Sequence, residues 1–83
     1  MTTTSFTGLV NTNGEFETVE SVTGLTLTSA KKYTIQVQNI AELKVADAVF
    51  TLENTIINYL QSSDALYIKT GSLGAVLTVL ENA

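Results

Sequence analysis

Short runs in which apolar and polar residues alternate recur along this chain of 83 residues, and they constrain its fold more than any other feature. Residues 33–38, with the sequence YTIQVQ, contain the clearest run. A period of two places Tyr33, Ile35 and Val37 on one face of a strand and leaves the polar residues on the other. This pattern is typical of a half-buried antiparallel strand.

Two further runs near the C-terminus, residues 65–69 and 75–80, also predict strands. The connection between them contains Gly71 and Gly74 and predicts a tight hairpin. The predicted core combines the apolar faces of the three runs: Tyr33, Ile35, Val37, Leu66, Ile68, Leu77 and Val79. The sequence therefore predicts an all-β fold, a compact antiparallel β-sandwich or small barrel of about six to eight short strands.

The remaining segments are less uniform. Residues 11–14, Asn-Thr-Asn-Gly, predict a turn because Asn and Gly tolerate positive φ, and residues 15–22 are expected to form the next strand. In residues 41–60, apolar positions from Val45 to Leu60 recur at helical spacing, which indicates an α+β alternative with a helix within 41–60. The same region is rich in Val, Phe, Thr and Ile, so strands are favoured.

The surface of this chain is expected to be under-charged. Charged residues make up 14% of the chain and hydrophobic residues 45%, whereas an average protein has about 25% charged residues. A domain of this size is thinly stable on its own, and without Cys or His it has no disulfide and no Cys- or His-ligated metal to strengthen it. Oligomerisation is the remaining way to add stability to such a small domain, so we expect a homo-oligomer.

The charge balance narrows the class of partner. The formal net charge is −4, from 8 acidic residues and 4 lysines, and the sequence contains no Arg. Such a chain is a poor match for nucleic acid or for an anionic membrane surface. The N-terminus has neither the basic nor the apolar region of a secretory signal peptide, so we expect synthesis in a cytoplasm.

The residue types that usually perform catalysis are scarce. Without His, the Ser and Thr hydroxyls lack the commonest base, so we expect no enzymatic activity, no catalytic residues and no cofactor. Asn11, Asn13 and Glu15 alternate as in part of a calcium loop, but the terminal bidentate acid is missing, so a plain turn without metal is expected. Tyr59 and Tyr67 leave a carbohydrate- or receptor-binding β module as the alternative function.

Part of the chain resembles a known group of proteins. Residues 33–39 (YTIQVQN) are followed by residues 63–71 (SDALYIKTG) and by a last apolar strand that ends at Glu81. This order resembles that of small all-β accessory virion proteins of tailed bacteriophages. The resemblance implies a structural protein of a capsid decoration, head-fibre, collar or tail-tip type, commonly trimeric, which is made in the host cytoplasm and resides in the virion. Its partners would be further copies of itself and other virion proteins.

We expect one β domain over residues 6–83, preceded by a flexible polar arm over residues 1–5. The last strand is apolar on both faces, so its outer face is expected to meet another subunit. The predicted interface combines the arm and this outer face: Thr2, Thr3, Thr4, Ser5, Phe6, Val76 and Leu80.

Overall fold

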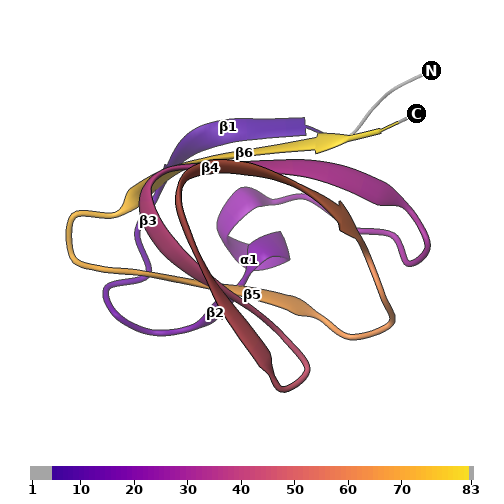
Figure 1. Cartoon of the computed structure of the whole chain (residues 1–83), viewed down its shortest axis with the longest axis horizontal. Helices are drawn as coiled ribbons and strands as arrows, with labels where there is room; N and C mark the ends of the chain where they lie inside the picture. Colours follow the sequence, from indigo (N-terminus) through magenta and orange to yellow (C-terminus); the bar gives the residue numbers. More distant parts are fainter. Residues whose placement is uncertain (1–4, 83) are drawn as a thin grey trace.

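The computed structural model describes residues 5–82, which form one curled antiparallel sheet around a short helix (Figure 1). The elements follow one another as β1 (Ser5–Val10), β2 (Glu17–Thr18), α1 (Val19–Thr23), β3 (Lys32–Val45), β4 (Ala48–Leu60), β5 (Leu66–Thr70) and β6 (Ala75–Glu81). The all-β prediction is confirmed, in the form of a half-barrel. The strands favoured over a helix for residues 41–60 are also confirmed, since β3 and β4 occupy this region.

Strand β3 lies at the centre of the sheet. Along one edge it pairs with β4 over almost its whole length. Along the other edge its first part pairs with β6 and its last part with β5. Strand β1 then pairs with β6, and β2 pairs with β5, which gives the order β1-β6-β3-β5-β2 with β4 on the far side of β3.

A bend divides this sheet into two halves. The register of β3 and β4 shifts between Val37 and Ile40, which marks an irregularity of the β-bulge type. Asn39 on β3 and Asn54 on β4 both have positive φ there, 75° and 47°, and the backbone N–H of Asn39 donates to Asn54 Oδ1 at 2.9 Å. We call the part with β1, β6, residues 32–38 and residues 55–60 the first half. The part with β2, β5, residues 41–45 and residues 48–53 is the second half.

The core lies on the concave face of the curl, where α1 is enclosed (Figure 1). Helix α1 begins after Thr18, whose side chain accepts a hydrogen bond from the backbone N–H of Ser21, and it ends at Gly24 with φ 75°. Val19 is its buried residue. The predicted core is confirmed, because all of the following residues are buried: Tyr33, Ile35, Val37, Leu66, Ile68, Leu77 and Val79.

Two predictions of local structure are wrong. Residues 15–22 form only the two-residue strand β2 before the chain turns into α1, because capping at Thr18 and Gly24 stabilises a single helical turn. The connection at residues 71–74 is not a hairpin, since β5 and β6 both pair with β3 and not with each other. The turn at residues 11–14 is confirmed, with φ 54° at Asn13 and 87° at Gly14.

Candidate interface

The convex face of the first half is almost free of charge. Its side chains alternate with the buried ones along four strands, and the pairing places Thr7, Thr78, Gln36 and Ile56 in one row across the sheet. We call this surface the neutral face, and it consists of Ser5, Thr7, Leu9, Thr34, Gln36, Gln38, Ile56, Asn58, Leu60, Val76, Thr78 and Leu80. Lys32 lies at its border, opposite Leu60.

Large apolar side chains are exposed on the neutral face. Leu9 is 66% exposed, Ile56 60%, Leu60 58% and Leu80 45%, and Val76 beside them is half-buried. Single exposed apolar residues are ordinary, but a group of them on one uncharged sheet face is typical of a surface that contacts another protein.

Some polar residues of the neutral face already have hydrogen-bond partners within the chain. Thr7 Oγ1 donates to Thr78 Oγ1 at 3.3 Å, and Thr34 Oγ1 donates to Asn82 Oδ1 at 3.1 Å. Hydroxyl and amide groups that already have hydrogen-bond partners cost less free energy to remove from water than unpaired groups do. A partner could therefore cover this face without removing an ion from solvent.

The convex face of the second half is different, because it carries charges. Lys69 Nζ lies 3.2 Å from Glu42 Oε2, and both side chains are about one third exposed. Lys69 and Lys44 also place their ammonium groups 5.0 and 5.5 Å from the centroid of the Phe16 ring, within the range of cation–π contacts. Covering this side would require desolvation of ions, which costs far more than covering neutral groups.

The structure brings three of the predicted interface residues together. Ser5, Val76 and Leu80 lie on the neutral face, and Ser5 is directly opposite Leu80 in the β1–β6 pairing. Phe6 points to the other side of β1, where it packs against the core. Thr2, Thr3 and Thr4 lie outside the described residues.

Sequence reasoning missed the contributions of Leu9, Ile56 and Leu60 to this surface. The available signal was the run of residues 56–60 (IINYL). In a strand, this run places apolar residues on both faces. Only the pairing with β3 shows which of them point outward, because Ile57 and Tyr59 face the buried Ile35 and Tyr33.

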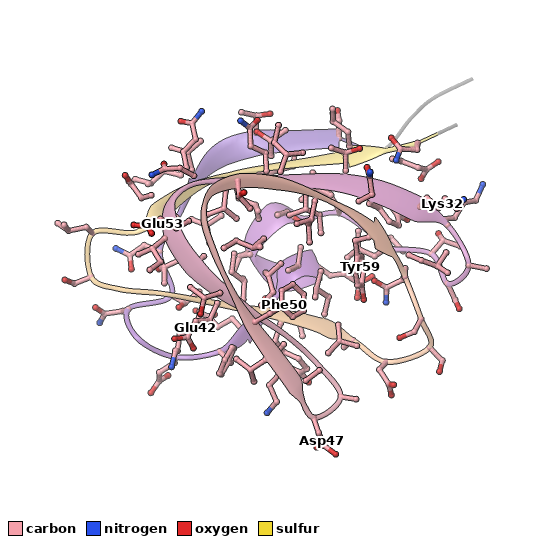
Figure 2. The ribbon with its side chains drawn as sticks, in the orientation of Figure 1. Lys32, Glu42, Asp47, Phe50, Glu53 and Tyr59 are labelled. Carbon is pink, nitrogen blue, oxygen red and sulfur yellow. The ribbon has the colours of Figure 1, made fainter. Side chains whose placement is uncertain are left out.

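Strand β4 also has a free edge. Within residues 5–82 it pairs only with β3, so its other edge faces away from the sheet. Phe50 and Tyr59 lie toward the concave side of the curl (Figure 2). Burial raises the pKa of Tyr59 above its usual 10.0, and its hydroxyl oxygen has no hydrogen-bond partner in the described chain. Glu53 is the one acidic or basic residue on the whole strand.

A concavity of about 480 Å³ lies at the bend, and Glu53 is the single acidic or basic residue among those that line it, which include Asn39, Asn54 and Leu73. In the loop at residues 11–14, Asn11 Oδ1 accepts the backbone N–H of Asn13 at 2.8 Å, so this oxygen closes the turn. Across residues 5–82, no three acidic side chains come together as a metal site.

The two tyrosines considered for carbohydrate binding do not share a surface. Tyr59 pairs with buried Tyr33 on the concave side, whereas Tyr67 pairs with Lys44 on the convex side of the second half.

No family model, curated protein or solved structure matched the chain. In the part that the structure describes, no helix has the length and apolar character to cross a membrane.

Proposed function

We propose that this chain is a structural accessory protein of a bacteriophage virion, of a capsid decoration, head-fibre or tail type, which acts by assembling with other virion proteins. The observation that carries the proposal is the neutral face, an uncharged sheet surface with several exposed apolar residues. The resemblance of residues 33–81 to small phage virion proteins supplies the biological setting.

The physical character of the chain supports an assembly role. The sheet contains two long strands, β3 and β4. Its second half carries Glu42, Lys44 and Lys69 on a separate surface that can face solvent. A protein repeated on a lattice gains avidity from many weak contacts, so a modest neutral face can suffice for stable attachment.

The test is attachment to virions purified from a phage that encodes the chain. We expect the wild-type protein to sediment with the particles and Leu80→Lys to reduce the bound fraction, since it places a charge on the neutral face. Thr51→Lys is the matched control, because Thr51 is an exposed residue on the charged convex side, opposite Glu42. The structure places Ser5, the last residue of the predicted arm, in β1. Deletion of residues 1–4, which leaves Ser5 in place, tests separately whether the rest of the predicted arm anchors the protein.

Absence of the wild-type chain from purified virions would refute the proposal. Equal binding of Leu80→Lys and wild type would remove the neutral face from it. A glycan array with wild type and Tyr67→Ala examines the carbohydrate-binding alternative, since Tyr67 is the more exposed of the two tyrosines considered for that role.

A further inference from the structure

We propose that two copies of this chain pair in antiparallel fashion along residues 55–60 of β4, about a two-fold axis at Asn58. The curled sheet of one copy then continues into the sheet of the second. This inference deepens the proposed assembly function and rests on it for its biological meaning, but its geometry comes from β4 alone.

The free edge of β4 is the first observation. In a sheet, each strand directs alternating backbone N–H and C=O groups to either side. Strand β3 pairs with the backbone groups on one side of β4, and no described strand pairs with those on the other side. An edge of this kind binds an added strand through main-chain hydrogen bonds, and little conformational entropy is lost because β4 is already extended.

The second observation is that residues 56–60 complement themselves. An axis at Asn58 places Ile56 opposite Leu60 of the second copy and Ile57 opposite Tyr59 of the second copy, each pair occurring twice. Ile56 and Leu60 are both on the convex face, and Ile57 and Tyr59 are both on the concave face. Every apolar residue of the segment thus meets an apolar residue on its own face, as antiparallel pairing requires.

Neighbouring registers lack this match. An axis at Ile57 would place Thr55 opposite Tyr59 and Ile56 opposite Asn58, so that each apolar side chain except Ile57 would face a polar one. The Asn58 register leaves only the two asparagines to face each other, and their amides can hydrogen-bond across the axis.

The charges fit a second copy as the occupant. Residues 55–60 contain no charge, although the chain as a whole carries −4. Lys32 and Glu53 flank opposite ends of this part of β4 (Figure 2). Antiparallel pairing directs Glu53 of each copy toward the end that carries Lys31 and Lys32 of the other, since Lys32 pairs with Leu60 and the Lys31 carbonyl accepts the Gln61 N–H.

Pairing in this register also enlarges the neutral face. Leu60 and Ile56, which now lie at its border, become the centre of one continuous surface made by both copies, with Lys32 of each copy beside Leu60. Apolar groups at the centre of an interface contribute more binding energy than those at its rim, because they are fully removed from water.

A single engineered cysteine tests the register, because the chain has no cysteine of its own. Opposed residues of antiparallel strands have Cβ atoms about 4.5–5.5 Å apart, close enough for a disulfide after slight adjustment. We expect Asn58→Cys to form a covalent dimer on mild oxidation, seen on a non-reducing gel. Thr51→Cys is the matched control, since it is exposed on the same strand but lies far from its own counterpart in this register.

Charge exchange provides the second test. Asn58→Lys and Asn58→Glu each place like charges face to face, so light scattering should show a dimer for wild type and a monomer for either variant alone. A mixture of the two variants should restore the dimer. Both substitutions are at an exposed position, so far-ultraviolet circular dichroism should show an unchanged fold.

A monomeric wild type at millimolar concentration, or equal cross-linking of the two cysteine variants, would overturn the β4 pairing. A monomer that still sediments with virions would refute this pairing and leave the proposed function intact. A dimer that is absent from virions would support this pairing and refute the proposed function.

Discussion

The connection between β5 and β6 offers a sharp test of the fold, because its two glycines have opposite environments. Gly74 is buried with φ +74°, and a Cβ added there would lie 2.7 Å from the carbonyl oxygen of Val10. Gly71 is exposed, its φ is outside the left-handed range, and a Cβ there would meet nothing within 4 Å. The two alanine variants therefore differ only in where the same methyl group is placed.

The expected cost of Gly74→Ala has two parts. A left-handed conformation costs a non-glycine residue about 1–2 kcal/mol. Relief of the contact with the Val10 carbonyl requires a backbone shift, and overpacking of this kind costs roughly 1–3 kcal/mol. The sum, about 2–5 kcal/mol, is a large share of the roughly 4–12 kcal/mol that stabilises a domain of this size. It corresponds to a fall in Tm of about 8–40 °C.

Urea unfolding followed by far-ultraviolet circular dichroism measures this difference. Gly71→Ala should unfold at the wild-type midpoint or slightly above it, because alanine restricts the unfolded chain and gains about 0.4–1 kcal/mol. Gly74→Ala should unfold at a much lower midpoint with a similar slope. If the two variants have the same midpoint, the close approach of Gly74 to the end of β1 is wrong, and with it the packing of β1 against this turn.

Three further predictions concern buried polar groups. Tyr33→Phe removes the hydroxyl that accepts the Thr28 backbone N–H at 2.7 Å, and it should lower the free energy of unfolding by about 1–2 kcal/mol in urea titrations. Thr12→Val removes the acceptor of the Thr70 N–H at 2.8 Å in a buried pair, and should cost about 1–3 kcal/mol by the same assay. Because burial raises the pKa of Tyr59, the unfolded chain ionises first, so stability should fall as pH rises through about 10, less steeply in Tyr59→Phe.

Each of these has a control. Tyr67→Phe alters an exposed hydroxyl and should change stability by less than about 0.5 kcal/mol, so a similar loss in both tyrosine variants would contradict the role of the Tyr33 hydrogen bond. Thr51→Val is the control for Thr12→Val, because Thr51 is exposed and its substitution should change the free energy of unfolding little. Identical pH profiles of wild type and Tyr59→Phe above neutral pH would exclude a raised pKa at that position.

The fold class and the core were predictable because the strands that form the core follow a simple alternation. Tyr33, Ile35 and Val37 are buried on β3 as their spacing indicates. The helical spacing in residues 41–60 was misleading for a physical reason. Strand β4 is at an edge and carries apolar residues on both faces, such as Ile56 outside and Ile57 inside, so its pattern loses the period of two.

The missed features depend on long-range partners or on very short segments. Nothing local to residues 71–74 reveals that the strands on either side both pair with β3, since the paired residues are separated by at least 21 positions, as Val45 and Leu66 are. Helix α1 has only five residues, so no periodicity could reveal it, although the capping residues Thr18 and Gly24 were a usable signal. Prediction of the neutral face would have required the pairing registers of four strands, which the sequence alone does not give.

The pairing of β1 with β6 has a kinetic consequence. Among the strands that the structure describes, β1 pairs with β6 alone, as in the contact between Ser5 and Leu80, which are far apart in the sequence. The β3–β4 hairpin can form early from neighbouring residues, but the sheet cannot be completed until β6 has been synthesised. We therefore expect folding in milliseconds to seconds once β6 is available, with β1 docking late. Before that, the nascent chain depends on dilution or chaperones to avoid aggregation.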